Sequence, residues 1–362
     1  MQAVRVAEYN KPYILTTIPV PSDLGPHDLL VKVATASYCH TDSMVSSGVF
    51  STALPCTASH EGAGTVVSVG ASATSLFRPG DRVVCGLPLH ACGSCADCLG
   101  PEQRRHYCRR TAGHVGVLVD GCLAEYVRVD ARWTTPLPGG VSMVAGAPLA
   151  CAGRTVWRAV VATGLGEGEW LAIVGSGGGL GHLGVRFAKA RGLRVVGIDA
   201  RDEALALSRE CGADGVVDAR MGAEAVAERV RELVGEGEDG GAHAAIVLAD
   251  TDDAAALACA VTRMHGTVIQ VAQPDVVKIP FRELIFRDIR VHGSVLCSAQ
   301  DSRDMVEFVA EHGIEPKTVV FHGLESIFDL LKVVHGGKIQ GKAVIIVDQD
   351  QIDQERKLGE KH

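Results

Sequence analysis

Short apolar runs separated by glycine and proline dominate the first 150 residues of the chain. Residues 29–33, 64–69, 82–85 and 124–129 are rich in valine or alternate between apolar and polar positions, as half-buried strands do. Residues 1–6 predict a further strand. This half of the chain is therefore expected to be β-rich, with long loops between its strands.

From about residue 151 onwards, strand and helix patterns alternate. Helical spacing over residues 154–163 is followed by strands predicted at 170–174, 194–199, 215–218, 244–248 and 267–272, and by helices predicted at 181–191, 203–211, 223–234 and 253–264. Such alternation is typical of right-handed βαβ units on a parallel sheet. We therefore predict a doubly wound nucleotide-binding domain over residues 153–296.

The residues after 296 are expected to return and complete the first domain. They predict helices at 302–312 and 325–335 and strands at 317–321 and 343–347. The first domain would then comprise residues 1–152 and 297–362. Residues 348–362 are polar and charged, so we expect them to form a loosely ordered tail. The predicted fold class is α/β with two domains.

Composition narrows the possible functions of these 362 residues. Hydrophobic residues make up 47% and charged residues 22%, as in soluble globular proteins. No run is long and apolar enough for a membrane span, and the net charge of −8 argues against nucleic acid as the main partner. The first residues carry no basic and then apolar leader, so we expect a cytoplasmic location. The twelve cysteines there would bind metal or do thiol chemistry rather than form disulfides.

A glycine-rich run joins the strand predicted at 170–174 to the following helix. Its members are Gly175, Gly177, Gly178, Gly179, Leu180 and Gly181. Glycines let the backbone approach a pyrophosphate, and a helix N-terminus offers free N–H groups. Asp199, 18 residues after Gly181, ends the next predicted strand, where an acid binds a ribose and repels a 2′-phosphate, which favours NAD over NADP. The alternative is a tight strand–helix turn with no ligand.

A compact set of cysteines predicts a metal site. Cys92, Cys95 and Cys98 follow the C-x₂-C-x₂-C spacing, and Cys108 comes shortly after them. Four thiolates satisfy tetrahedral zinc and leave no open position, which indicates a structural zinc ion. The alternative is a group of four free thiols.

Three scattered motifs carry further metal-ligand residue types: Cys39-His40-Thr41-Asp42, Ser59-His60-Glu61-Gly62 and Cys151-Ala152-Gly153. Each motif alone is unremarkable, because a single cysteine or histidine is usually a packing residue. Together they supply two thiols and an imidazole. Three such ligands leave zinc an open position for water or substrate.

With these motifs, the chain resembles the zinc-dependent medium-chain alcohol dehydrogenases, most of all those of the yeast and fungal type. The resemblance extends over residues 4–347 and also includes the runs at 79–83, 120–126 and 337–342. It implies a GroES-like β-rich catalytic domain beside a Rossmann domain. It also implies two zinc ions per chain, NAD(H) as cofactor, an alcohol or carbonyl substrate, and a homo-oligomer, either dimer or tetramer.

The resemblance also implies roles for single residues. Cys39, His60 and Cys151 would hold the catalytic zinc, Glu61 would approach the metal transiently, and Asp42 would orient the ligands. Thr41 would pass on the substrate proton. His40 and Lys342 would lie near the cofactor pyrophosphate, which the turn at 177–181 would wrap.

Three positions depart from the family pattern. Ser47 stands where yeast-type enzymes carry a histidine that ends the proton relay, and serine is no base near neutral pH. Cys98 and Cys108 are separated by nine residues where the family usually has seven, so His106 is an alternative ligand to Cys108. Phe50 and Leu87 replace pocket tryptophans, which predicts a roomier pocket and a substrate larger than ethanol.

Two other functions stay open at this point. One is a specialised pathway reductase that acts on a C=C or C=N bond, and the other is a non-catalytic nucleotide-binding protein on the same fold. Retention of the zinc-ligand residues favours alcohol and carbonyl chemistry over both. The remaining cysteines are expected to be small buried hydrophobes: Cys56, Cys85, Cys122, Cys211, Cys259 and Cys297.

Overall fold

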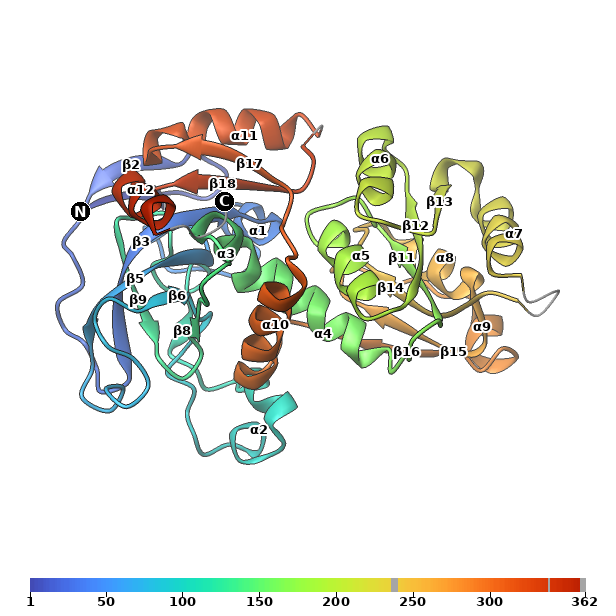
Figure 1. The fold of residues 1–362 in the computed structure, drawn as a ribbon, viewed down its shortest axis with the longest axis horizontal. Helices are drawn as coiled ribbons and strands as arrows, with labels where there is room; N and C mark the ends of the chain where they lie inside the picture. Colours follow the sequence, from blue (N-terminus) through green and yellow to red (C-terminus); the bar gives the residue numbers. More distant parts are fainter. Residues whose placement is uncertain (236–239, 338, 359–362) are drawn as a thin grey trace. The chain divides into compact units, whose positions relative to one another are not determined.

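The chain divides into two compact units in the computed structural model, which describes residues 1–235, 240–337 and 339–358 (Figure 1). The first unit comprises Met1–Arg154 and Cys297–His362, and the second comprises Thr155–Leu296. The first boundary thus lies after Arg154, whereas the sequence pattern put it after residue 152. Position 338, within the run at 337–342, lies outside the described residues.

The first unit is built on a seven-stranded sheet. Its strands follow the order β10 (Thr135–Pro136), β6 (Arg82–Val84), β5 (Glu61–Val69), β3 (Asp28–Tyr38), β18 (Lys342–Ile346) and β17 (Thr318–His322), and β9 (Tyr126–Asp130) also pairs with β3. Two smaller sheets join β2 (Ile14–Thr17), β1 (Gln2–Val6) and β4 (Cys56–Thr57), and β7 (Pro88–Leu89) with β8 (Gly113–His114). The β-rich character predicted for this part of the chain is confirmed.

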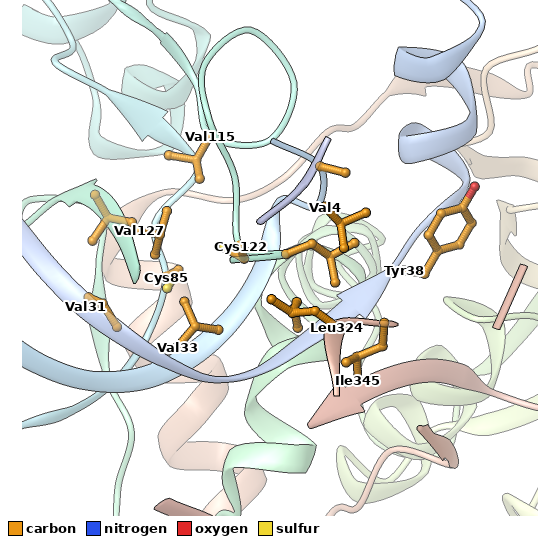
Figure 2. Close-up of a cluster of buried hydrophobic side chains, with 14 of the residues drawn as sticks. Val4, Val31, Val33, Tyr38, Cys85, Val115, Cys122, Val127, Leu324 and Ile345 are labelled. Carbon is orange, nitrogen blue, oxygen red and sulfur yellow. The ribbon is translucent and has the colours of Figure 1, made fainter. Parts of the chain in front are cut away.

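The core of the first unit combines residues from both ends of the chain. Figure 2 shows Val4 and Val31 from the N-terminal strands in the same cluster as Leu324 and Ile345 from the C-terminal segment. β18 pairs antiparallel with β3, so the returning segment also extends the sheet. The residues from Cys297 onward thus belong to the first unit.

The helices of the first unit lie mainly in its connections. They are α1 (His40–Ser46), α2 (Ala96–Leu99), α3 (Met143–Pro148), α10 (Ala299–His312), α11 (Ile327–His335) and α12 (Gln349–Lys357). A π-helix, Leu149–Gly153, continues α3 and leads into α4 (Arg154–Ala162). Pro148 lies at the end of α3 and has no N–H to continue the regular ladder, which helps to explain the wider turn after it.

The prediction of a loosely ordered tail over residues 348–362 is wrong for its described part. Residues 349–357 form α12, whose Ile352 is fully buried. Glu355 is also buried and accepts a hydrogen bond from the backbone N–H of Met143 at 2.8 Å. The prediction failed because the segment is mostly polar and only one face of the helix is buried. Positions 359–362 lie outside the described residues.

The second unit contains a six-stranded sheet in which every pairing is parallel. The strand order is β13 (Gly215–Asp218), β12 (Arg194–Asp199), β11 (Trp170–Val174), β14 (Ala242–Val247), β15 (Thr262–Gln270) and β16 (Arg290–Gly293). This order is typical of a doubly wound dinucleotide-binding domain. The helices between the strands are α5 (Gly181–Ala190), α6 (Asp202–Glu210), α7 (Ala223–Val234), α8 (Ala254–Val261) and α9 (Phe281–Ile285).

Helices cover both faces of this parallel sheet. Val226 and Val230 of α7 and Ala258 of α8 share one apolar cluster with Ala172 of β11. On the other face, α5 approaches so closely that a Cβ at Gly184 would lie 3.4 Å from Cδ1 of Ile173. The predicted doubly wound architecture is confirmed, although α8 ends at Val261 and not at residue 264, because residues 262–264 begin β15.

A search of the described helices finds none that is both long and apolar enough to span a membrane.

Candidate active site

The Asp42 side chain links the segment that follows β3 to the segment that precedes β5. It is the third residue of α1, and its Oδ2 accepts a hydrogen bond from the backbone N–H of Cys39, the N-cap, at 2.8 Å. Its Oδ1 accepts one from the backbone N–H of Ser59 at 3.1 Å. The same carboxylate therefore fixes the turn that presents Cys39 and the turn that presents His60.

Ser59 has a left-handed backbone, with φ of 69°, immediately before His60. A residue other than glycine pays a strain cost in this region, and such strain is held only by its surroundings. Those surroundings are tight, because Cβ atoms at Gly116 and Gly121 would each lie 2.1 Å from the Ser59 carbonyl oxygen. The Ser59 hydroxyl also donates to the carbonyl of Ser37 at 2.8 Å.

His60 is buried and faces Asp42. Its Nδ1 lies 3.4 Å from Oδ1 of Asp42, and neither ring nitrogen has a hydrogen-bond partner among the described residues. Burial alone disfavours the imidazolium, but the Asp42 carboxylate outweighs this effect and raises the pKa of His60 well above its ordinary value. With Nδ1 directed to a carboxylate, Nε2 is the nitrogen available to a metal.

Cys151 reaches the same place from the π-helix Leu149–Gly153. The following backbone N–H, that of Ala152, donates to Oε1 of Glu61 at 3.1 Å. A hydrogen bond from Cys151 holds the pKa of Cys39 well below its ordinary value, whereas that contact and burial raise the pKa of Cys151. The two sulfurs lie within 4.8 Å of each other.

Four side chains converge as a consequence: Cys39, His60, Glu61 and Cys151 each offer a ligand atom, and these atoms all lie within 4.8 Å of one another. Two sulfurs and an imidazole nitrogen that is buried without a hydrogen bond are a donor set that zinc prefers. These residues therefore fit a zinc ion with an open fourth position.

Glu61 pairs with Lys342 beside this cluster. Lys342 Nζ lies 2.7 Å from Glu61 Oε2, and both side chains are buried. Burial raises the pKa of Glu61 to about 7, against the opposing effect of Lys342. The resemblance implies that Lys342 would lie near the cofactor pyrophosphate, and in the structure its ammonium group pairs with Glu61.

Three residues in or next to α1 have predicted roles in proton transfer or cofactor binding: Thr41, His40 and Ser47. They differ in exposure. Thr41 is half-buried, and its Oγ1 lies 3.9 Å from Cys39 Sγ. His40 is exposed at the first position of the helix. Ser47 is exposed at the C-cap, and its hydroxyl donates to the Met44 carbonyl at 3.1 Å. The Thr41 side chain therefore lies beside the thiol of a proposed metal ligand.

The two residues predicted to shape the substrate pocket are packed in different ways. Leu87 is 5% exposed and belongs to the core of the first unit. Phe50 is partly buried and packs against that core. Their role in substrate selection remains a prediction.

The second cysteine group also comes together. Cys92, Cys95, Cys98 and Cys108 form a cluster in which Cys92 Sγ lies 3.9 Å from Cys98 Sγ and 3.6 Å from Cys108 Sγ. Zinc–sulfur bonds of 2.3 Å in a tetrahedron would separate the sulfurs by about 3.8 Å. The backbone N–H of Ser94 helps to lower the pKa of Cys92 to about 5, which favours the thiolate. Cys108, rather than the alternative His106, is the fourth member.

The glycine run of the second unit forms the turn between β11 and α5. Gly175 has a φ of +90°, and Leu180 is the N-cap of α5. A Cβ at Gly177 would lie 2.0 Å from the Ala204 carbonyl oxygen, so only glycine fits there. Asp199 Oδ2 accepts a hydrogen bond from the Gly177 N–H at 3.1 Å, so this acid also shapes the loop.

One feature of the first unit was missed by reasoning from sequence. Arg154 follows Cys151-Ala-Gly and is 3% exposed, with its guanidinium inside the unit. Arg154 and Arg158 are the charged residues of the predicted helix 154–163, and spacing alone fits an exposed position for both of them. No local sequence pattern predicts the pairing of Lys342 with Glu61, because 281 positions separate the two residues.

Comparisons with known proteins agree with this geometry. Residues 25–139 match the family model of the alcohol dehydrogenase GroES-like domain, and residues 179–311 match that of the zinc-binding dehydrogenases. An alcohol dehydrogenase of Geobacillus stearothermophilus is 34% identical over 96% of this chain and all of its own length. Alcohol dehydrogenase 1 of Emericella nidulans is 34% identical over 95% and 97%, respectively. The crystal structure of an alcohol dehydrogenase from Aeropyrum pernix superposes with a TM-score of 0.85 at 29% identity and covers 96% of this chain and 100% of that one.

Proposed function

The chain belongs to the zinc-dependent medium-chain alcohol dehydrogenase family, and from this premise we propose how its residues interconvert an alcohol and its aldehyde or ketone. The observation that carries the proposal is the convergence of Cys39, His60 and Cys151 beside Glu61 in the first unit. Zinc bound by the two thiolates and the imidazole supplies a Lewis acid for the substrate oxygen, and NAD(H) supplies the hydride chemistry.

Asp42 orients the site rather than reacting in it. Its carboxylate fixes the His60 ring through Nδ1 and the two backbone turns through Cys39 and Ser59. Glu61 holds the π-helical turn through the Ala152 N–H, and Lys342 balances the Glu61 charge. These contacts hold the ligand-bearing segments in place.

Thr41 is the group that would take the substrate proton. Its hydroxyl lies beside Cys39 and can accept and donate a hydrogen bond in turn. Ser47 has no ionisation near neutral pH, so the proton must reach water or another group after Thr41. Proton release in this chain would therefore lack a histidine as its last member.

The second unit would bind NAD(H). The Gly175–Gly181 turn gives its backbone N–H groups and the N-terminus of α5 to the pyrophosphate, and Asp199 would accept a ribose hydroxyl. The first unit would be the catalytic domain and the second the nucleotide-binding domain. A second zinc, bound by Cys92, Cys95, Cys98 and Cys108, would fold the loop around α2.

A substrate larger than ethanol is part of the proposal. Phe50 and Leu87 carry less aromatic bulk than the tryptophans at these positions in the yeast-type pattern. The expected preference is for aryl or branched alcohols, since a larger pocket buries more of them.

A homo-oligomer is also proposed. In the second unit, β16 is an edge strand, and the adjacent segment exposes Val276, Phe281, Ile285 and Phe286. An edge strand and an apolar patch on one unit are suited to pair with a second copy about a twofold axis. Light scattering should give a dimer or tetramer, which Phe281→Ser with Ile285→Ser would weaken.

We place the protein in the cytoplasm, where thiolate ligands stay reduced.

The test combines metal analysis with a substrate panel. Protein purified without chelators should contain two zinc ions per chain, and Cys151→Ala should contain one and lose turnover. Activity with NAD should favour an aryl or branched alcohol over ethanol. One zinc that persists in Cys151→Ala would refute the catalytic site. NADH binding with two zinc ions but no turnover on alcohols or carbonyls would instead support a non-catalytic protein, and turnover on C=C or C=N bonds alone would support the reductase alternative.

A further inference from the structure

Arg154 is a buried arginine behind the metal-ligand cluster. Its Nε donates to Ser302 Oγ at 2.7 Å, and its Nη2 donates to Thr135 Oγ1 at 2.9 Å and to the Trp133 carbonyl at 3.1 Å. The Thr135 and Ser302 hydroxyls are themselves hydrogen bonded at 2.7 Å. The planar guanidinium thus joins α10, β10 and the loop before β10 at one point.

The acceptors that the described part of the chain offers to Arg154 are neutral. Among the described residues, no carboxylate forms an ion pair with it, and burial lowers the pKa of the guanidinium. The groups whose negative charge would favour it are the thiols of Cys297, Cys151 and Cys85. A buried charge without an opposite charge beside it is a poor way to stabilise a fold, because an apolar side chain of similar size serves as well or better. A role in general stability therefore does not explain this residue.

The position of Arg154 in the chain suggests another role. It directly follows the π-helix Leu149–Gly153, which presents Cys151. Glu61 holds this turn from the cluster side through the Ala152 N–H. On the opposite side, α10 packs against it, since a Cβ at Gly153 would lie 3.1 Å from Met305 Sδ. Arg154 fastens the end of the turn to α10 through Ser302.

We propose that Arg154 is a positioning residue for the catalytic metal: its hydrogen bonds to Ser302, Thr135 and Trp133 hold the π-helical turn that presents Cys151. This inference rests on the proposed function, because it assumes that Cys151 binds zinc. Residues behind a metal ligand typically change metal affinity by about 10- to 100-fold when removed. The planar guanidinium of arginine holds several N–H donors in a fixed geometry. Lysine has a single ammonium group with a different geometry, so it is a poor replacement for Arg154.

The experiment measures metal release from the full-length holoprotein with a chromogenic zinc chelator. Cys151→Ala and Cys98→Ala identify which release phase belongs to which site. Arg154→Met should release the catalytic zinc about tenfold faster, with the release of the other zinc and the Tm unchanged or the Tm raised. Arg154→Lys should fall between Arg154→Met and the wild type.

Cobalt substitution gives a second readout, because the visible absorption of the catalytic site should shift in Arg154→Met. Arg158→Met, one turn further along α4, is the matched control, since Arg158 bonds to Ser294 Oγ and the Val295 carbonyl instead.

Two results would overturn the inference: catalytic zinc released from Arg154→Met at the wild-type rate, or both zinc ions released faster together with a lower Tm. If Arg154→Met does not fold, Ser302→Ala provides the same measurements and should accelerate the catalytic phase alone. A wild-type protein that lacks the Cys151-dependent zinc would refute the proposed function as well. Wild-type protein with both zinc ions and an unchanged variant refutes only the role of Arg154.

Discussion

Asp42 and His60 lie on different segments of the chain, yet Asp42 Oδ1 is 3.4 Å from His60 Nδ1 and also accepts the Ser59 N–H. The second oxygen of the same carboxylate caps α1 at Cys39. One acid thus sets the position of two proposed metal ligands and the free nitrogen of the imidazole. The geometry of the proposed metal site therefore includes Asp42 as well as the ligands.

Removal of the Asp42 charge should weaken the catalytic metal. Asp42→Asn keeps the size of the side chain but not its full hydrogen-bonding capacity, so we expect zinc affinity at this site to fall by about 10- to 100-fold. Equilibrium dialysis against a zinc buffer measures this. Asp81→Asn is the control, because Asp81 accepts the Arg78 N–H in an exposed turn of the same unit. Equal zinc affinity in Asp42→Asn and wild type would contradict the orienting role.

The cysteine cluster around α2 should lose its zinc when Cys108 is replaced. Cys108→Ala removes a sulfur that lies 3.6 Å from Cys92 Sγ, so this zinc should be lost and the Tm should fall. His106→Ala should retain two zinc ions per chain, because His106 is outside the four-cysteine cluster. Zinc loss in His106→Ala with retention in Cys108→Ala would reverse this assignment.

Asp199 should determine the preference for NAD over NADP. Asp199→Ala removes the carboxylate that would bind the ribose, and a hydrogen bond to a charged group contributes about 1.5–3 kcal/mol. The ratio of kcat/KM for NAD to that for NADP should therefore fall by at least about tenfold. Asp202→Ala is the control, because Asp202 is exposed and pairs with Arg220. An unchanged ratio in Asp199→Ala would contradict the cofactor role and leave Asp199 a local structural role, through its contacts with Gly177, Ala200 and Arg201.

Ser47→His should add an ionisation to the pH profile. The wild-type profile of kcat/KM should lack a histidine limb, whereas an exposed histidine at this position titrates near pH 6.5. The neutral imidazole is the proton acceptor, so alcohol oxidation by the variant should rise with pH through that value. The comparison is made between the two profiles over pH 5–9. A limb near pH 6.5 already present in the wild type and unchanged in the variant would contradict the proton path.

The six cysteines outside both clusters are buried, as the sequence predicts. Burial raises the pKa of Cys56 and of Cys259 to about 12. Because the thiolate is the reactive form, only about one molecule in 10⁴ is ionised at pH 8 at each of these sites. Iodoacetamide followed by mass spectrometry should leave both unlabelled in native protein and label both after denaturation. Rapid labelling of Cys259 in the native protein would contradict this prediction and would indicate local unfolding of α8.

Local patterns in the sequence specify much of this protein. The strands Trp170–Val174 and Arg194–Asp199 and the helix Ala223–Val234 have the bounds that their patterns predict, because alternation and apolar spacing reflect contacts with a sheet or core nearby. The C-x₂-C-x₂-C spacing predicts a metal site for a similar reason, since its ligands are local. The tail was misjudged because one buried face, with Ile352 and Glu355, is a small signal within nine mostly polar residues.

The sequence by itself therefore determined the two-domain α/β fold, the residue types for two metal sites and the glycine turn. Tertiary structure alone decided that Cys39, His60 and Cys151 meet, that Lys342 pairs with Glu61, and that Arg154 bonds to Ser302. The physical reason is distance along the chain. Hydrophobic periodicity and turn chemistry act over a few residues, whereas these contacts join segments up to 281 positions apart, and only the packing of the whole unit brings them within hydrogen-bond range.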